Sequence, residues 1–383
     1  MAVAGYFPED LTRDILLRIP VKSLSRFRCV HRTWDSLFNS SSFIITHFNN
    51  SNKKGHNFMM VMIPHFEKID KYHTTQLRFR LFTRDTYNVY LNLEGEAPFR
   101  ITSLNNYYLI NYPFVGFCNG LVCLHNDVQQ PQQIVLYNPC LKQHKIIQPP
   151  FTVSDFRDKV LGFGYDSINN DYKVVYWRKR EGHGIRTQAQ VYTLGTNSWR
   201  KVDPPDNITF ISVLENFQAF LNGAIHWWGK DQKDGCQVIV SFKVCSEEFQ
   251  VFPLPDYVPP AKKFGMNFEI IGIYVCRDLL CVSVATIYDH LNNSYDIWGM
   301  GEYGVQESWT RLFVVNNEQR PDSSSYFRGI GTNGELVWSR QDTGRLKATL
   351  NYCDNEKSHN IEFGDDDNFP LFPFVTYTES LVS

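Results

Sequence analysis

The 383-residue sequence lacks the segments that export a protein or hold it in a membrane. No apolar run approaches the ~20 residues of a membrane-spanning helix, and the N-terminus lacks the charged-then-apolar order of a signal peptide. Lys and Arg form no concentrated tract and the net charge is −2, which disfavours nucleic acid or an anionic membrane as the main partner. We therefore expect a soluble intracellular protein, in the cytoplasm or also in the nucleus.

The sequence also lacks the spacing of a metal site. Its nine cysteines include no Cys-x-x-Cys pair, and the histidines do not stand where a zinc site would need them. Cys118 and Cys123 flank one turn, and Cys276 and Cys281 flank another, so each pair could face across a hairpin. We interpret them as small apolar strand residues of a reducing compartment. The sequence predicts no metal and no cofactor.

No constellation of catalytic residues stands out. His226 has no Gly-x-Ser-x-Gly elbow to supply a nucleophile, and in an alternating strand we interpret it as a packed core residue. Gly162-Phe163-Gly164 lacks the third glycine and the following helix of a dinucleotide-binding fingerprint. The sequence therefore predicts a protein that is not an enzyme.

Two charged runs are candidates for contact with a target protein. One is basic and precedes a loop, and the other is acidic without the alternating ligand spacing of a calcium site. Solvated surface loops are the alternative for both. Their residues are Arg178, Lys179 and Arg180, and Asp365, Asp366 and Asp367.

Residues 1–48 differ in pattern from the rest of the chain and predict a module of three short helices. Apolar residues recur at helical spacing after Pro8, and Pro20 ends the first helix. These apolar residues outnumber what one small core can hide, which favours a module completed by a partner. The alternative is a subdomain packed on its own chain. The polar residues 49–57 read as a linker.

The remaining residues, 58–383, carry two interleaved repeats. Aromatic strands recur every 50 to 56 residues, and tight hairpin turns such as Asn119-Gly120 and Asn222-Gly223 lie between them. A residue without bulk precedes each turn, as expected where inner strands crowd near an axis. The reference aromatics are Phe82, Tyr137, Tyr192, Phe242, Trp298 and Tyr352.

One tight hairpin and one aromatic hairpin make a four-stranded propeller blade. Five blades are complete between about 114 and 363, and a sixth has its aromatic hairpin at 76–94. Its inner strands must come from Phe58–Met62 and from Phe374–Tyr377, so that the chain ends close the ring. We predict a mainly β fold: a three-helix module and a β-propeller-like domain of six blades closed by the C-terminal strand. Two stacked β domains or an open β array are the alternatives.

The N-terminal residues resemble an F-box. The resemblance lies in Phe7-Pro8-Glu9-Asp10-Leu11, Ile15-Leu16, Ile19-Pro20-Val21-Lys22-Ser23-Leu24, Arg26-Phe27-Arg28-Cys29-Val30 and Trp34. It departs at Phe7, where Leu is usual, and at His31, where Cys or Ser is common. The resemblance implies docking on the Skp-type adaptor, and through it on the cullin, of a ubiquitin ligase. The residues implied to bind the adaptor are Pro8, Leu11, Ile15, Leu16, Ile19, Pro20, Val21, Leu24, Arg26, Cys29, Val30 and Trp34.

The rest of the chain resembles the kelch-like F-box-associated domain of plant F-box proteins. The signals include Val115-Gly116-Phe117-Cys118-Asn119-Gly120-Leu121, Tyr137-Asn138-Pro139, Asn222-Gly223-Ala224-Ile225-His226-Trp227 and Tyr303-Gly304-Val305-Gln306-Glu307-Ser308-Trp309. The ending Tyr377-Thr378-Glu379-Ser380-Leu381-Val382 is similar to that of S-locus F-box proteins and their relatives. In the S-locus group the resemblance implies ribonucleases as targets, and in wider relatives it implies other regulatory proteins.

Together the two resemblances imply a substrate receptor of an SCF-type ubiquitin ligase, in which the propeller holds a target protein and the F-box tethers it. Catalysis then belongs to other subunits. A scaffold acting outside degradation and an enzymatic or carbohydrate-binding propeller are the alternatives. We also expect residues 1–48 to be sufficient for adaptor binding. One sequence does not name the target.

Overall fold

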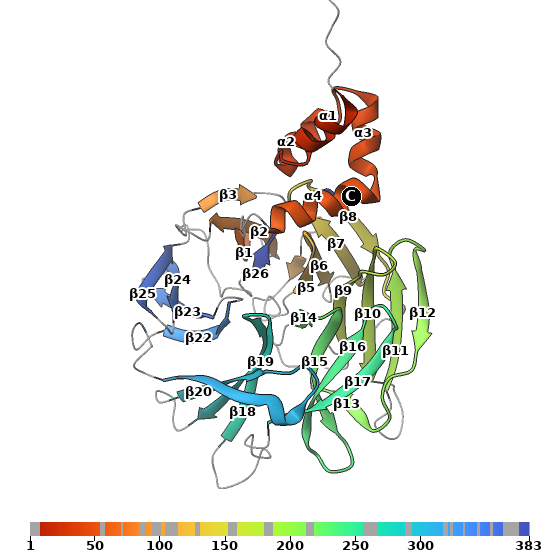
Figure 1. Ribbon diagram of the computed structural model, residues 1–383. Helices are drawn as coiled ribbons and strands as arrows, with labels where there is room; N and C mark the ends of the chain where they lie inside the picture. The colour runs from red at the N-terminus through yellow and green to blue at the C-terminus, as the bar shows by residue number, and fades with distance from the viewer. Residues whose placement is uncertain are drawn as a thin grey trace, which may run out of the picture.

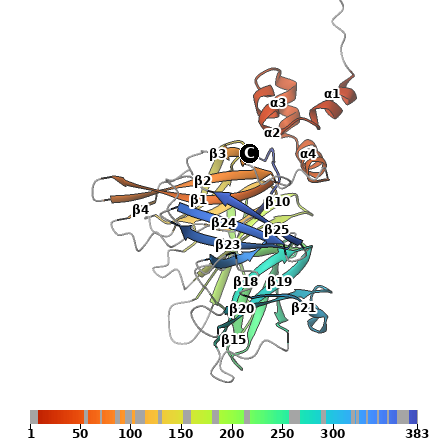
Figure 2. The ribbon, with the colours of Figure 1, turned by 90° about the vertical axis from the view of Figure 1, so that its left-hand side faces the viewer.

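The chain forms a group of α-helices at one edge of a large β domain (Figure 1). The computed structural model describes residues 8–53, 58–69, 72–83, 89–93, 101–103, 114–126, 131–151, 159–179, 187–211, 218–255, 267–287, 293–316, 321, 325–331, 334–342, 345–352, 355–362 and 375–382. Viewed from the side, the helices project beyond the sheets and the C-terminus lies beside them (Figure 2).

The helical part contains four helices, not the three that the sequence predicts. They are α1 (Glu9–Leu16), α2 (Val21–Phe27), α3 (Arg32–Asn39) and α4 (Ser41–Lys53). Pro8 and Pro20 stand at the N-caps of α1 and α2, where the missing N–H of proline costs nothing. His31 caps α3 by accepting a hydrogen bond from the backbone N–H of Thr33.

The predicted linker at 49–57 is wrong in its first part, because α4 continues to Lys53. Polarity alone does not end a helix, and no proline or glycine interrupts the chain before Gly55. The buried face of α4 carries Phe43 and His47, which are one helical turn apart. Residues 54–57 lie outside the described part of the chain.

The described strands form six antiparallel sheets. The first has the order β26-β1-β2-β3, with β4 beside β2, and consists of β1 (Phe58–Ile69), β2 (Tyr72–Thr83), β3 (Val89–Leu93), β4 (Ile101–Ser103) and β26 (Val375–Tyr377). The second consists of β5 (Phe114–Cys118), β6 (Leu121–Asn126), β7 (Gln133–Asn138) and β8 (Gln143–Ile147). The third consists of β9 (Lys159–Asp166), β10 (Asp171–Lys179), β11 (Thr187–Thr193) and β12 (Ser198–Val202).

The fourth sheet has the order β13-β15-β16-β17, with β14 also paired to β15, and consists of β13 (Ile208–Phe210), β14 (Ala219–Leu221), β15 (Ala224–Asp231), β16 (Gln237–Lys243) and β17 (Glu248–Pro253). The fifth consists of β18 (Asn267–Cys276), β19 (Leu279–Ile287), β20 (Asn293–Met300) and β21 (Trp309–Val315), with the short helix η3 (Gln306–Ser308) before β21. The sixth consists of β22 (Ser325–Ile330), β23 (Glu335–Asp342), β24 (Arg345–Tyr352) and β25 (Asn355–Glu362).

The repeat pattern of the sequence matches this topology. Each reference aromatic lies on the third strand of its sheet, from Phe82 on β2 to Tyr352 on β24. Asn119-Gly120 joins β5 to β6 and Asn222-Gly223 joins β14 to β15, and all four residues have positive φ, as a tight hairpin turn requires. The predicted pairing of the chain ends is confirmed, because β26 pairs with β1 with Phe58 opposite Tyr377.

The core lies mainly between neighbouring sheets. One apolar cluster joins the second and third sheets around Phe163, and another joins the third and fourth around Trp177, Trp227 and Phe242. On the first strand of the second sheet, a Cβ on Gly116 would overlap with the side-chain amide of Gln218, which lies just before β14 of the fourth sheet, and on the first strand of the third sheet a Cβ on Gly162 would overlap with Trp227 of the fourth. Small residues on these strands therefore permit the sheets to pack, as the sequence predicts.

Candidate functional site

The exposed apolar side chains of the helical module are its most distinctive surface. Leu11 and Ile15 on α1 are 46% and 47% exposed, and Val30 after α2 is 66% exposed. Leu11 and Ile15 are four residues apart and therefore lie on one face of the helix. Pro8 at the start of the same helix is exposed as well. Solvated leucine, isoleucine and valine side chains gain free energy when a partner covers them.

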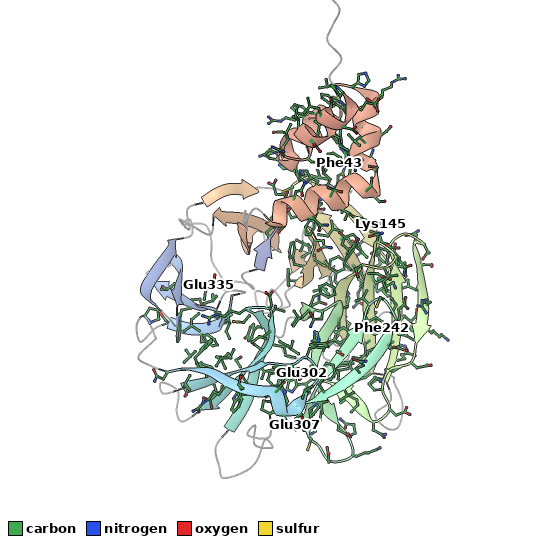
Figure 3. The ribbon with its side chains drawn as sticks, in the orientation of Figure 1. Phe43, Lys145, Phe242, Glu302, Glu307 and Glu335 are labelled. Atoms are coloured by element: carbon green, nitrogen blue, oxygen red, sulfur yellow. The ribbon has the colours of Figure 1, made fainter. Side chains whose placement is uncertain are left out.

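A separate set of apolar residues forms the core of the module. Leu16, Val21, Leu24, Phe38 and Phe43 are buried, and Leu16 is only 2% exposed. The rings of Phe38 and Phe43 lie 5.3 Å apart, and Phe43 points from α4 into the helical group (Figure 3). Buried His47 of α4 forms a hydrogen bond with the backbone carbonyl of Ile19 at 2.8 Å and so ties α4 to the segment between α1 and α2.

Burial therefore divides the adaptor-binding residues implied by the F-box resemblance. Leu16, Val21 and Leu24 lie in the core of the module and are not part of its exposed surface in this conformation, so their contact with the adaptor stays a prediction. Ile19 and Trp34 are half-buried against the same core, and the ring of Trp34 lies 5.8 Å from that of Phe27. The residues that remain accessible are Pro8, Leu11, Ile15, Pro20, Arg26, Cys29 and Val30.

The module core also receives residues that are far away in the sequence. Leu381, near the C-terminus, is 1% exposed and belongs to the same cluster as the buried residues of α1 to α4. Cys140 and Leu141, from the turn between β7 and β8, pack against it. Sequence spacing does not reveal this participation, because an isolated C-terminal leucine has no periodic signal.

The candidate target-contact residues are only partly described. Arg178 and Lys179 end β10, where the guanidinium carbon of Arg178 lies 3.8 Å from the ring centre of Phe151 and the ammonium of Lys179 lies 5.3 Å from that of Phe210. Such cation–π contacts hold the two charges at the end of the strand. Arg180, Asp365, Asp366 and Asp367 lie outside the described residues.

His226 occupies a structural position inside the β domain. Its Nδ1 lies 3.1 Å from the carbonyl oxygen of Ala219 and its Nε2 lies 2.6 Å from the hydroxyl of Tyr303. A carbonyl oxygen only accepts, so Nδ1 carries the proton and Nε2 accepts from the tyrosine O–H. Burial lowers the pKa of His226 to about 4, although the carbonyl contact opposes that effect. The neutral imidazole thus joins β14 to the segment after β20.

A buried ion cluster joins the third and fourth sheets. The ammonium of Lys173 lies 2.7 Å from Asp166 and 2.8 Å from Glu247, and Arg200 also contacts Glu247. The carbonyl oxygen of Val244 accepts a further hydrogen bond from Lys173. Burial by itself would raise the pKa of Asp166, but Lys173 and Asn169 outweigh it and lower the pKa. The cluster is satisfied by its own members, which points to a structural role.

Neither a membrane span nor a metal site is found in the part of the chain that the structure describes. None of the described helices is long and apolar enough to cross a bilayer. Among the same residues, His, Cys, Asp and Glu form no group of three or more that could hold a metal ion.

Comparison with known proteins assigns the chain to a class. Residues 6–46 match the F-box domain, and residues 39–383 match the F-box associated beta propeller domain. The chain therefore belongs to the F-box proteins that carry an F-box associated β-propeller domain. At the level of this family, the F-box implies binding to a Skp-type adaptor, and the two domains together imply a substrate-recognition subunit of an SCF ubiquitin ligase. Proteins of this family are typically non-catalytic adaptors.

Its relatives are plant proteins. The chain is 25% identical to F-box protein CPR1 of Arabidopsis thaliana over 93% of its own length and 86% of that protein, and 25% identical to an F-box/kelch-repeat protein of the same plant over 92% and 89%. Among solved structures, it resembles the acylaminoacyl peptidase of Pyrococcus horikoshii at 7% identity with a TM-score of 0.36, covering 78% of this chain and 52% of that one. That likeness is too weak to carry any argument about activity.

Proposed function

We propose that this protein is the target receptor of an SCF-type ubiquitin ligase and that the exposed face of α1, with Val30, binds the Skp-type adaptor. The observation that carries the proposal is the pair Leu11 and Ile15, each nearly half exposed on one face of a helix that is anchored in the core by Leu16. A small module with a buried core and a separate apolar face fits docking on a partner. The buried residues Leu16, Val21 and Leu24 support that face from within.

The adaptor interface is tested with the double variant Leu11→Ala/Ile15→Ala in the full-length protein. We expect binding to a purified Skp-type adaptor to weaken about tenfold or more, because buried interface anchors commonly contribute 1 kcal/mol or more each. Ile168→Ala is the matched control, since Ile168 is 73% exposed in a turn of the third sheet. Wild-type affinity of the double variant would overturn the assignment of α1. A Leu16→Ala variant would not be informative, since it removes a core residue.

For the β domain we propose that the six sheets are the blades of one propeller, closed where β26 pairs with β1, and that this propeller holds the target protein. Support comes from the repeated sheet order and from the apolar clusters between neighbouring sheets. The segments that connect the strands lie at the surface, and in proteins such segments usually determine which partner is bound. Arg178, Lys179 and Arg180 remain candidates for target contact, as do Asp365, Asp366 and Asp367.

The target role is tested by affinity purification from plant tissue while cullin neddylation is inhibited. We expect a protein that binds the full-length wild type and the Leu11→Ala/Ile15→Ala variant equally well, and that acquires ubiquitin with the wild type when inhibition is released. A target that binds and is never ubiquitinated would favour a scaffold that acts outside degradation. We propose cytoplasm and nucleus as the compartments, which fractionation of the same tissue tests.

The narrower hypothesis of an S-locus pollen factor that recognises ribonucleases depends on the C-terminal ending alone. In the structure Tyr377, Thr378, Ser380 and Leu381 are buried against the rest of the chain. Residues that are buried within the protein do not contact a bound target. The C-terminal ending therefore does not support a ribonuclease as the target. Direct binding of a purified S-type ribonuclease to the full-length protein would support it independently.

A further inference from the structure

The last described residues of the chain lie between its two domains. After β26, Thr378–Val382 passes between the helical module and two turns of the second sheet. Ser380 and Leu381 are each 1% exposed, although terminal residues are ordinarily solvated and mobile. Both views place the C-terminus beside the helices (Figures 1 and 2). We name residues Thr378–Val382 the C-terminal clasp.

On the propeller side, Asn138 holds the clasp by its side-chain amide. Its Nδ2 donates to the carbonyl oxygens of Ser380 at 2.9 Å and Val382 at 2.7 Å. Its Oδ1 accepts from the backbone N–H groups of Cys140 and Leu141, at 3.0 and 3.2 Å. One buried side chain thus satisfies two carbonyl groups of the clasp while its own turn holds it in place.

A second turn of the same sheet accommodates the clasp by lacking a side chain. A Cβ on Gly120 would overlap with the Cβ of Ser380 and lie 3.0 Å from its backbone nitrogen. Gly120 also has φ +81°, which a larger residue adopts at a cost. The turn therefore requires glycine both for its own conformation and for the passage of the clasp.

On the helical side, the clasp completes the module in two ways. Leu381 enters the apolar core beside Val21 and Phe43. The carboxyl group of Glu379 lies near the backbone N–H of Val21, the first residue of α2, and this N–H opposes the rise that burial gives to the pKa of Glu379. The N-cap residue of α2 is Pro20, which makes no side-chain capping bond. Glu379 thus places an acidic group at the N-terminus of α2, where the helix dipole favours negative charge.

A short polar chain connects the strand to the clasp. The hydroxyl of Tyr377 donates to Sγ of Cys140 at 3.1 Å, and the carboxyl group of Glu379 lies close enough to the Cys140 thiol to raise its pKa. Burial raises the pKa of Glu379, while Cys140, Val21 and Lys22 oppose that rise. These groups come from β26, the clasp, the second sheet and α2, so the polar contacts of the junction link all four.

We propose that the C-terminal clasp fixes the F-box module at one orientation on the propeller. Leu381 and Glu379 contact the helices, and Asn138 holds the clasp, so the helical module is fixed to the second sheet. A target held by the propeller would then be presented to the ligase from a constant direction. This explains two motifs that adaptor binding does not use, Tyr137-Asn138-Pro139 and the ending Tyr377–Val382. The inference goes beyond the proposed function, and its test needs neither adaptor nor target.

The decisive variant is Asn138→Asp in the full-length protein. Aspartate keeps the oxygen that accepts from Cys140 and Leu141, but it replaces the two N–H donors by an oxygen that faces the carbonyl groups of Ser380 and Val382. The matched control is Asn170→Asp, the same chemical change in an exposed turn of the third sheet, where Asn170 accepts a hydrogen bond from Tyr165. A chain ending at Thr378, which retains β26, is the second test variant.

Hydrogen–deuterium exchange and small-angle X-ray scattering provide the readouts. We expect both test variants to accelerate exchange in α2 by about tenfold or more and to broaden the distribution of interatomic distances, while β10 and β11 remain as protected as in the control. Unchanged α2 exchange and scattering in both variants would overturn the proposal. Equal acceleration in α2 and in β10 would also overturn it, because the clasp would then contribute to propeller stability in general.

Discussion

The indole ring of Trp227 lies against Gly162 of the neighbouring sheet, where it fills the space that a Cβ on Gly162 would need. The same indole donates from Nε1 to the carbonyl oxygen of Leu161 at 2.8 Å. Two sheets are therefore joined at this point by one side chain that is both packed and hydrogen-bonded, and its position depends on a glycine opposite.

We predict that Gly162→Ala destabilises the β domain by about 1–3 kcal/mol, the usual cost of overpacking a filled core. The added methyl group would press on Trp227 and on Ile225. Thermal or urea unfolding followed by tryptophan fluorescence measures the change. Gly223→Ala is a useful comparison because a Cβ there meets no atom within 4 Å, although its positive φ adds some strain. A Gly162→Ala variant as stable as wild type would show that Trp227 can move aside.

His226 predicts a defined pH dependence of stability. Its folded pKa, about 4, lies below the ordinary value of 6.5, so the unfolded chain binds more protons between these two values. Stability contributed by the neutral imidazole is therefore complete above about pH 6.5 and is lost as the pH falls toward 4, by about 3 kcal/mol in total. Urea midpoints measured from pH 7 to pH 4.5 test this.

The control for that pH series is His226→Gln, whose amide can retain one of the two hydrogen bonds without titrating. The slope of stability against pH should be smaller in this variant than in the wild type. If both proteins lose stability equally on acidification, another group is responsible for the pH dependence.

Lys173 is predicted to be indispensable to the junction of the third and fourth sheets. Lys173→Met leaves the carboxylates of Asp166 and Glu247 without their shared cation in a buried site, which commonly costs about 3–5 kcal/mol. Chemical unfolding of the variant measures this loss. An additional Glu247→Gln substitution should recover part of it, because one uncompensated charge is then removed; no recovery would mean that packing and not charge is responsible.

The structure changes the expectation that residues 1–48 bind the adaptor independently. That fragment lacks most of the polar end of α4 and all of Leu381, Cys140 and Leu141, which complete its core. We predict that Leu381→Ala in the full chain destabilises the module by about 3 kcal/mol and that a 1–53 fragment is only partly helical. Circular dichroism of the fragment with and without adaptor tests this; a stably folded free fragment would contradict it.

The sequence predicts the features that depend on residues close together in the chain, and it does not predict contacts between residues that are far apart in it. Turn residues such as Asn119-Gly120 and the recurring aromatics act within one hairpin, so the strands and their sheet order could be predicted. The pairing of β26 with β1 could be predicted by counting, since an incomplete sheet requires a partner. The contacts of Asn138 with Ser380 and Val382 could not, because an asparagine in a turn is ordinarily satisfied by that turn.

The same limit applies to the docking module. Helical spacing identifies Leu11, Ile15 and Leu16 as apolar but does not say which of them is covered. The division between exposed Leu11 and buried Leu16 depends on where α4 and the C-terminus lie, and α4 ends in polar residues with little amphipathic pattern. The sequence therefore predicts which segment forms the candidate site. Only the structure shows which of its apolar residues are exposed to a partner and which are buried in the core.

The partnership of β1 with β26 has a consequence for the synthesis of the protein. β1 begins at Phe58 and is made early, but β26, the strand that covers its edge, begins only at Val375. Until Val375–Tyr377 has been synthesised, the nascent chain exposes a row of unpaired backbone groups along β1. Pairing of β26 with β1 is therefore among the last steps in assembling the β domain, and a chain that stops before Val375 would keep an open strand edge that cellular quality control can detect.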